Sequence, residues 1–285
     1  MTLTRCDEPP ARCAPDEAAP HAALCQRVLA GLRSGEFRMA YQGIYSVESG
    51  DLARLEALIR WQHPEYGLLL PGAFADTLDD PDVAAELTAF VIDTVCRELA
   101  QWQHEGGAVR PVAINVPPSV AATPGFGQRL QDVCRVYGIE PRCLEIELSE
   151  GQDLARFPDL PKVVKLLRMH GVGVAMDDFG TGYACLAALC PTGFSTVKVA
   201  KELLSAVPAC PNSCAVVSAV VALMTQLCMT VVVEGVETAA QAQWLAQWPQ
   251  LLAQGFFLAR PSFGIDSVPG ARTLALDDAH HMRAA

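Results

Sequence analysis

The sequence is poor in charged residues, and positive charge is the scarcer kind. Only 19% of its 285 residues are charged, and 21 lysines and arginines stand against 32 aspartates and glutamates, so the formal net charge is −11. This balance does not favour binding to duplex nucleic acid or to an anionic membrane, because both are polyanions. A phosphate-bearing ligand must therefore be held locally, and metal ions are the simplest means.

Signals for secretion and for zinc binding are also missing. The first 20 residues are polar and rich in proline and alanine, unlike a secretory signal. The eleven cysteines are an odd number with no CxxC pair. The closest pairs, Cys185 with Cys190 and Cys210 with Cys214, lack histidines at ligand spacing. We therefore expect reduced thiols that pack as small hydrophobic side chains in a cytoplasmic protein.

One uncharged run raises the question of a membrane span. Residues 215–233 carry no charge, which is long enough to cross a bilayer. However, Ser218, Thr225 and Gln226 interrupt the run, and its end changes from helical to strand character directly before an acidic residue. We therefore predict a buried helix followed by a buried strand.

The remaining chain alternates between strand and helix patterns after an initial hairpin. Helical spacing of apolar residues predicts a first helix over 21–37, and two apolar runs, 37–45 and 52–61, are joined by the turn signature Glu48-Ser49-Gly50-Asp51. The strands expected next are 112–116, 144–148, 172–177, 196–199, 231–234 and 251–254. The helices expected between them are 82–105, 124–137, 158–170, 183–190, 212–227 and 238–246.

This order predicts a single α/β domain. Alternating strands and helices call for parallel strands in one sheet, and the length and the apolar fraction of 51% suit one α/β barrel. We predict a modified TIM-type (β/α)8 barrel with an antiparallel first strand over residues 21–265. Residues 1–20 lack a hydrophobic period and are expected to be a disordered tail, and residues 266–285 a second tail.

Two adjacent carboxylates end one of the predicted strands. Asp177 and Asp178 follow the apolar run 172–176, and Gly180 and Gly182 allow a tight loop that could close over a ligand. Neighbouring carboxylates cannot both ionise cheaply unless a positive charge lies between them, and a hard divalent cation is the usual one. A solvated turn is the plain alternative. A kinase Asp-Phe-Gly motif is rejected, because the other kinase motifs are missing.

Polar residues stand near the carboxyl ends of the other predicted strands as well. Because side chains alternate along a strand, Glu145 and Glu147 share the face opposite the leucines and isoleucine of 144–148. The same placement holds for Glu56, Asn115, Thr196 with Lys198, and Glu234. A barrel points these ends at one rim, where barrel enzymes carry out their chemistry. Each residue alone could be a satisfied buried polar group, but their shared placement favours one site.

Several of these stretches resemble the EAL-domain family, bacterial phosphodiesterases that hydrolyse cyclic di-GMP to linear pGpG. The resemblance runs from about residue 41 to 261. Its motifs are Tyr41-Gln42, Glu56-Ala57-Leu58-Ile59-Arg60-Trp61-Gln62-His63-Pro64, Asn115, Glu147-Leu148-Ser149-Glu150, Asp177 to Tyr183, Lys198, Glu234-Gly235-Val236-Glu237-Thr238 and Gln254-Gly255-Phe256.

The resemblance implies roles for the matching residues. The implied ligands of a first Mg²⁺ or Mn²⁺ ion are Glu56, Asn115, Glu147 and Asp177. Those of a second ion are Asp177, Asp178 and Glu234. The residues implied in catalysis are Glu56, Lys198, Glu234, Asp178 and Glu150, of which Lys198 positions or deprotonates the attacking water and Glu150 braces the loop that carries Asp178. The implied contacts to the dinucleotide are Gln42, Leu58, Arg60, Gln254 and Glu237. The family is often dimeric, which implies a homodimer.

The residue types agree with this chemistry. Two cations would neutralise the phosphodiester, lower the pKa of a bridging water and align it with the leaving oxygen. An oxygen-rich ligand set without histidine or cysteine selects hard ions over zinc. Arg60 could add a bidentate contact to phosphate or to a guanine edge, or lie on the surface beside Trp61.

The sequence departs from the family pattern at a few positions. Where the family commonly has Lys-Ile-Asp, this chain has Lys198-Val199-Ala200, so an acidic partner of the lysine is missing. The remaining departures are Gly43 for proline, Lys201 for arginine, Cys228 for a helix-ending glycine, and Ala184-Cys185 after Tyr183. We predict that Ala200 lowers turnover more than metal binding, since every metal ligand is present.

Two classes of function stay open. The first is hydrolysis of cyclic di-GMP, which would lower signalling that controls biofilm formation and motility. The second is a catalytically weak or silent EAL domain that acts as a cyclic di-GMP receptor or a protein-binding regulator. Silent members usually lose metal ligands or loop glycines, and this chain keeps both, which favours the enzyme. A sugar- or nucleotide-phosphate barrel enzyme of another kind would need different rim residues.

Overall fold

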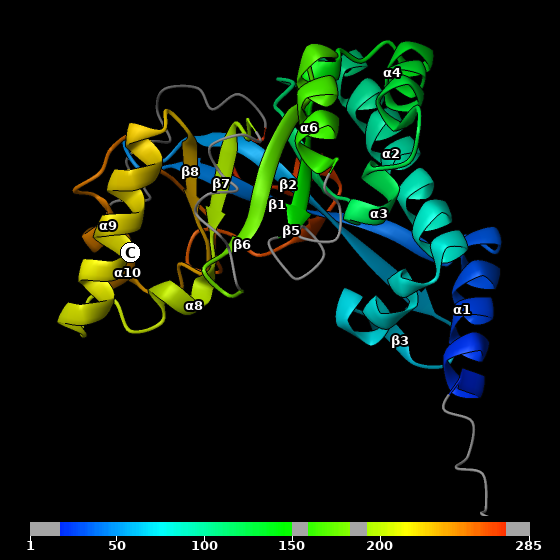
Figure 1. Cartoon of the computed structure of the whole chain (residues 1–285), viewed down its shortest axis with the longest axis horizontal. Helices are drawn as coiled ribbons and strands as arrows, with labels where there is room; N and C mark the ends of the chain where they lie inside the picture. Colours follow the sequence, from blue (N-terminus) through cyan, green and yellow to red (C-terminus); the bar gives the residue numbers. More distant parts are fainter. Residues whose placement is uncertain (1–17, 150–158, 183–192, 272–285) are drawn as a thin grey trace, which may run out of the picture.

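The computed structural model describes residues 18–149, 159–182 and 193–271, and these form a closed eight-stranded barrel (Figure 1). In spatial order the ring contains β1 (Phe37–Ser46), β9 (Leu252–Ala253), β8 (Thr230–Val233), β7 (Thr196–Val199), β6 (Gly173–Phe179), β5 (Leu144–Ser149), β4 (Val112–Asn115) and β2 (Leu52–His63), which pairs again with β1. Strand β1 is antiparallel to both neighbours, and all other neighbours in the ring are parallel. The predicted barrel with an antiparallel first strand is confirmed.

Most helices of the described chain cover the outside of this ring. The helices are α1 (Ala18–Arg33), α2 (Pro81–His104), α3 (Pro118–Ala121), α4 (Phe126–Tyr137), α6 (Leu160–Met169), α8 (Lys201–Leu204), α9 (Pro211–Gln226) and α10 (Ala239–Leu245). Helix α1 instead packs beside α2 at the far end of the β1–β2 hairpin. Short 3-10 turns are η1 (Pro71–Ala73), η2 (Ala75–Asp79), η3 (Pro141–Cys143) and η4 (Ile265–Ser267), and the short strands β3 (Gly67–Leu69) and β10 (Ser262–Phe263) pair with β2 and β1. The expected helices agree within a few residues, except that 183–190 lies outside the described residues.

The predicted domain limits at 21 and 265 remain predictions. Helix α1 already begins at Ala18, and the described chain continues past η4 to Ala271. Near this end the Tyr45 hydroxyl donates to the Pro269 carbonyl oxygen at 3.1 Å. Most of both expected tails, residues 1–17 and 272–285, lies outside the described residues.

The main apolar core lies between the strands and the helices rather than inside the ring. Outward side chains of the strands pack there against helix faces with apolar residues three and four positions apart, such as Phe126, Leu130 and Cys134 of α4. Inward residues such as Ala113 and Ala175 are buried but take no part in this core. The interior of the ring therefore holds mainly small and polar side chains, with the buried Ile44 and Val232 among them.

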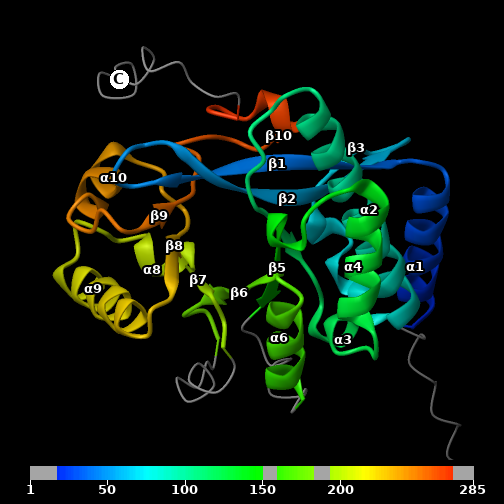
Figure 2. The ribbon, with the colours of Figure 1, turned by 90° about the horizontal axis from the view of Figure 1, so that it is seen from above.

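A smaller apolar cluster supports the far end of the β1–β2 hairpin. In Figure 2 these two strands run on beyond the ring toward α1. Phe37 stacks on Trp61 with ring centroids 5.0 Å apart, and Phe74 packs edge-on against both rings. Arg27 of α1 lies over Trp61 and pairs with Glu36 at 2.7 Å. This lobe is separate from the ring interior.

The uncharged run is divided between α9 and β8, but its helix is not buried all round. Only one face is covered, through Val217, Val221 and Met224, whereas Val216 is 48% exposed. The prediction of a buried helix is therefore wrong, because a helix outside a barrel buries only the face that packs on the strands. Among the described residues, no helix has the length and apolar character needed to cross a membrane.

The cysteines only partly follow the expectation of buried small side chains. All seven in the described part are free thiols, and Cys25, Cys96 and Cys134 are buried. The other four are partly or fully exposed: Cys143, Cys210, Cys214 and Cys228. Cys185 and Cys190 lie outside the described residues.

Helix α9 ends on a residue with a left-handed backbone. Cys228 has a φ of 56°, at the position where a glycine is expected, and Gly138 has a φ of 67° in the equivalent turn after α4. In both turns the following amide bonds the carbonyl oxygen five residues back, at 3.1 Å for Met229 and 2.9 Å for Ile139. Glycine adopts this backbone freely, but any residue with a Cβ is strained there.

We predict that Cys228→Gly raises the free energy of unfolding by about 1 kcal/mol, because it removes this strain. The reciprocal variant Gly138→Ala should lower it by a similar amount, and an added Cβ at that site meets nothing within 4 Å, so strain alone is tested. Urea denaturation of both variants measures the two changes. A Cys228→Gly variant no more stable than the parent would contradict the prediction.

Candidate active site

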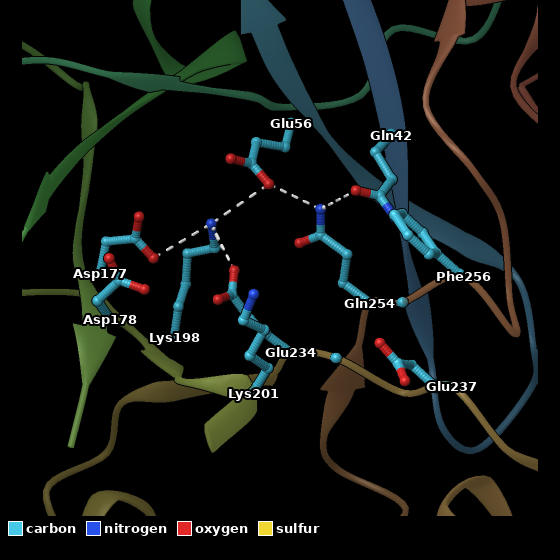
Figure 3. A pocket seen from close by; sticks show the side chains of 12 residues that line it. Gln42, Glu56, Asp177, Asp178, Lys198, Lys201, Glu234, Glu237, Gln254 and Phe256 are labelled. Atoms are coloured by element: carbon cyan, nitrogen blue, oxygen red, sulfur yellow. Dashed lines mark hydrogen bonds and ion pairs between the residues drawn. The ribbon is translucent and has the colours of Figure 1, made fainter. Parts of the chain in front are cut away.

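Polar side chains from most strands of the ring meet at one rim. Because β2 and β4 to β9 run parallel, alternation along each strand brings one inward residue to the same level. The residues brought together are Glu56 on β2, Asn115 on β4, Glu147 on β5, Asp177 and Asp178 on β6, Lys198 on β7, Glu234 after β8 and Gln254 after β9. Figure 3 shows several of them turned toward one pocket.

Lys198 lies at the centre of these carboxylates. Its side chain is only 2% exposed, and its Nζ atom lies 2.8 Å from Oε1 of Glu234 and 2.9 Å from Oε1 of Glu147. Oδ1 of Asp177 and Oε2 of Glu56 follow at 3.3 and 3.4 Å. A single ammonium group thus contacts four carboxylates that come from four different strands or strand ends.

The shifts in pKa show that the carboxylates at the rim repel one another and that Lys198 compensates this repulsion only in part. Burial would lower the pKa of Lys198, but the carboxylates around it, Glu147 first, outweigh burial and raise it well above its usual range. Burial raises the pKa of Glu147 well above its usual range, and that of Glu234 to about 7. Burial would also raise the pKa of Glu56, but Lys198 and two amide donors lower it. The rim therefore holds more acidic groups than its positive charge can keep ionised.

The rim fits divalent metal ions. Both oxygens of Glu147 and Oδ1 of Asp177 are buried and receive no hydrogen bond from the described residues, their ion pairs with Lys198 aside. One oxygen each of Asp177, Asp178 and Glu234 lies within 4.8 Å of the others. The five carboxylates exceed the lysine by four charges, which is the charge of two divalent ions. Buried carboxylate oxygens of this kind suit hard cations.

An irregularity in β6 brings both aspartates to the rim. Asp178 has a φ of 55°, and the pairing of β6 with β7 shifts register between Met176 and Phe179. Consecutive side chains of a regular strand point to opposite faces, and the shift lets Asp177 and Asp178 point to the same one. A left-handed backbone at a residue other than glycine costs about 1–3 kcal/mol and is typical of functional sites.

Two buried glutamines tie Glu56 to the neighbouring strands. Nε2 of Gln254 donates to Oε2 of Glu56 at 2.7 Å and to Oε1 of Gln42 at 3.1 Å, and Gln42 donates in turn to the Ala259 carbonyl oxygen. Oε1 of Gln254 is buried and has no donor among the described residues. In Figure 3 this oxygen faces the pocket, so a ligand with an N–H group can satisfy it.

Two cavities meet at these residues. The first has a volume of about 310 Å³ and is lined by the carboxylates, Lys198 and both glutamines. The second has a volume of about 760 Å³ and is mostly apolar, with Leu58, Asn115 and Glu147 among its lining residues. Asp178 borders both cavities, so a ligand larger than one nucleotide has space on both sides of it.

Of the five residues expected to contact a ligand, four line a cavity and one does not. Gln42, Gln254 and Glu237 line the first cavity and Leu58 the second. Arg60 lies on the inward face of β2 but lines neither cavity. It is 8% exposed and donates to the neighbouring Ile59 carbonyl oxygen at 2.9 Å. Glu150 lies outside the described residues, and its role remains a prediction.

The structure adds two residues to the site that the sequence reasoning did not assign. Lys201 and Phe256 both line the first cavity, and Phe256 is 50% exposed. Phe256 belongs to a motif already noted, and its place two residues after the expected contact Gln254 was the available signal. Ala200 is fully buried and follows the last residue of β7, directly before α8.

The comparisons with known proteins agree with this geometry. A family model described as the EAL domain matches residues 25–261. The curated protein "Cyclic di-GMP phosphodiesterase RocR" of Pseudomonas aeruginosa is 34% identical over 82% of this chain and 59% of its own length. "Uncharacterized protein Rv1354c" of Mycobacterium tuberculosis is 32% identical over 81% of this chain and 37% of its own length. The chain therefore spans only part of these relatives.

Two solved structures are similar to this chain over most of its length. The structure described as "PaMucR Phosphodiesterase, c-di-GMP complex" has a TM-score of 0.77 at 30% identity and covers 84% of this chain and 97% of that one. The EAL domain of Mycobacterium smegmatis DcpA has a TM-score of 0.71 at 26% identity and covers 84% of this chain and 100% of its own.

We predict that Lys198→Met lowers the free energy of unfolding of the metal-free chain by about 3 kcal/mol, because it leaves a buried carboxylate cluster without its counter-charge. Mn²⁺ restores positive charge there, so saturating Mn²⁺ should raise the melting temperature of the variant more than that of the parent. Differential scanning calorimetry measures both.

The matched control for this experiment is Lys162→Met. Lys162 pairs with Asp159 on the surface at 2.6 Å and has 79% of its side chain exposed. Its removal should change neither stability nor the Mn²⁺ response. Equal Mn²⁺ shifts in the parent and in Lys198→Met would contradict the prediction.

Proposed function

The chain belongs to the EAL domain family, and we propose that it hydrolyses cyclic di-GMP to linear pGpG with the help of two divalent metal ions, Mg²⁺ or Mn²⁺. The observation that carries this proposal is the meeting of five carboxylates, four of them in contact with Lys198, at a cavity on the barrel rim. Such a cluster has no structural benefit of its own, because the repulsion between buried carboxylates destabilises the fold.

The carboxylates divide into two ligand sets that share one residue. The first set is Glu56, Asn115, Glu147 and Asp177, and the second is Asp177, Asp178 and Glu234. Two divalent ions held there would neutralise the phosphodiester and make a water molecule nucleophilic at neutral pH. The buried oxygens without donors on Glu147 and Asp177 support this assignment.

Lys198 contributes a positively charged hydrogen-bond donor to the site. The surrounding carboxylates raise the pKa of its amine well above its usual range, so the amine is protonated in the metal-free site. Of the two roles implied by the resemblance, we assign it the positioning of the attacking water. Its place between the two ligand sets, in contact with Glu147 and Glu234, supports this role.

The two cavities provide space for a dinucleotide. Gln254, through its unpaired Oε1, and Glu237 offer acceptors for the N–H groups of a guanine edge, and Phe256 offers a ring on which a base can stack. Leu58 offers an apolar contact in the larger cavity. A similar protein, PaMucR, has been solved as a complex with cyclic di-GMP, which supports this class of ligand.

A cellular role follows from this activity. Hydrolysis would lower cyclic di-GMP signalling in the cytoplasm and so affect biofilm formation and motility. We also propose that the protein works as a homodimer, which analytical ultracentrifugation of the purified chain tests.

Product analysis tests the activity directly. The purified chain is incubated with cyclic di-GMP and Mg²⁺ or Mn²⁺, and the nucleotides are separated by chromatography. Linear pGpG supports the proposal, provided that Glu56→Gln abolishes its formation. Unchanged cyclic di-GMP that nevertheless binds to the chain identifies a receptor, which is the second candidate. Ala200, in place of an acidic residue, is the observation that favours the receptor.

We predict that Ala200→Asp raises turnover about tenfold or more, since it returns an acid–base partner near Lys198. Ala200 is the N-cap residue of α8, a position at which aspartate is a favoured cap, so we expect the buried aspartate to be tolerated there. The affinity for Mn²⁺ should stay unchanged. The uncharged variant Ala200→Asn is the control, and an equal rise in both variants would rule out a role of the charge.

A further inference from the structure

A second polar cluster lies inside the barrel beneath the rim, and the proposed reaction does not use it. Nη1 of Arg54 donates to both carboxylate oxygens of Glu145, at 2.8 and 2.7 Å, and to Oγ1 of Thr196 at 3.0 Å. The Thr196 hydroxyl donates in turn to Oε1 of Glu145. The three side chains thus form a closed triangle, which we call the lower triangle.

Each corner of the lower triangle stands directly below a residue of the rim. Arg54, Glu145 and Thr196 precede Glu56, Glu147 and Lys198 by two positions on β2, β5 and β7. Residues two apart on a strand share a face and are separated by about 6–7 Å along it. A shift of a strand that carries a lower residue therefore also shifts the rim residue above it.

The triangle links strands that have no backbone contact with each other. Strand β4 separates β2 from β5, and β6 separates β5 from β7. Backbone hydrogen bonds hold each of these strands only to its neighbours. The side chains of the lower triangle join the three strands across the interior of the ring. The distances between Glu56, Glu147 and Lys198 depend on how far apart these same strands lie.

The intervening strands leave space for this link. The inward residue of β6 at this level is Gly173, and a Cβ added there would lie 3.2 Å from the Cβ and Cγ atoms of Glu145. The inward residue of β4 is Ala113, which pairs in register with Glu145. Small residues at both positions let the Glu145 carboxylate reach the middle of the ring.

Burial makes the triangle a strong constraint. Glu145 is 5% exposed and Thr196 is 1% exposed, while the Arg54 side chain is 22% exposed. Without Arg54, the Glu145 carboxylate would be a further buried negative charge below a rim that already has an excess of them. Loss of Arg54 also removes the link between β2 and the other two strands of the triangle, so the spacing of the rim residues above them can change.

We propose that Arg54, Glu145 and Thr196 are positioning residues that fix the spacing of Glu56, Glu147 and Lys198 and thereby set the affinity of the rim for Mg²⁺ or Mn²⁺. This inference rests on the proposed function, since it requires that the rim binds metal. Residues that orient metal ligands from behind typically change metal affinity 10–100-fold when they are lost.

Mn²⁺ titration followed by electron paramagnetic resonance tests the proposal on the full chain. Arg54→Met should weaken Mn²⁺ binding about tenfold or more. The matched control is Arg27→Met, which breaks the Arg27–Glu36 pair of equal length, 2.7 Å, in the lobe away from the ring. Arg27→Met should leave Mn²⁺ affinity unchanged, even if it lowers the melting temperature by as much as Arg54→Met does.

Two milder variants cover the case in which Arg54→Met does not fold. Thr196→Val keeps the shape of the side chain but loses the hydroxyl, and should weaken Mn²⁺ binding. Thr196→Ser keeps the hydroxyl and should retain the parent affinity. A purely structural role would lower the melting temperature in these variants without a change in Mn²⁺ affinity.

The outcomes separate this inference from the proposed function. A parent chain that binds Mn²⁺ while Arg54→Met and Thr196→Val bind it equally well overturns the inference alone. A parent chain that does not bind Mn²⁺ overturns the proposed function and the inference together. Weaker binding in these variants, with Arg27→Met and Thr196→Ser unchanged, supports the positioning role.

Discussion

The repulsion between carboxylates at the barrel rim is the constraint on which the rest of the structure depends. Glu147 and Glu234 are held together with Glu56 and Asp177 around the ammonium of Lys198, whose side chain is only 2% exposed. Such a cluster persists only where a closed ring of strands prevents the groups from moving apart. The ring in turn persists because its outward side chains pack against a shell of helices.

Backbone irregularities bring side chains to the rim that regular strands could not place there. The left-handed Asp178 turns two consecutive side chains to one side. Gly255 lets the loop after β9 approach the loop after β8 so closely that a Cβ would lie 2.1 Å from the Val236 carbonyl oxygen. This approach places Gln254 beside Glu56. The close approach of the two loops and the hydrogen bonds of the glutamine side chains therefore lie on the same side of the cavity.

The sequence predicted the barrel and most rim residues because both follow from local patterns. Strand alternation identifies Glu147 and Lys198 without knowledge of their partners, since the carboxyl ends of parallel strands must meet. The lower triangle was not predicted, because nothing local distinguishes Arg54 from a surface arginine. Lys201 lines the cavity because α8 begins directly after the end of β7, which the sequence reasoning did not predict. The exposed face of α9 was missed because alanine and valine occur on either side of a helix.

The separation of a polar interior from an apolar shell has an evolutionary consequence. The shell that keeps the domain folded lies outside the ring and takes no side chain from the rim. Substitutions that remove carboxylates from the rim reduce the repulsion between them and leave that shell intact. Loss of rim carboxylates can then change the chemistry while the fold persists, so a catalytic domain of this architecture can evolve into a receptor without unfolding.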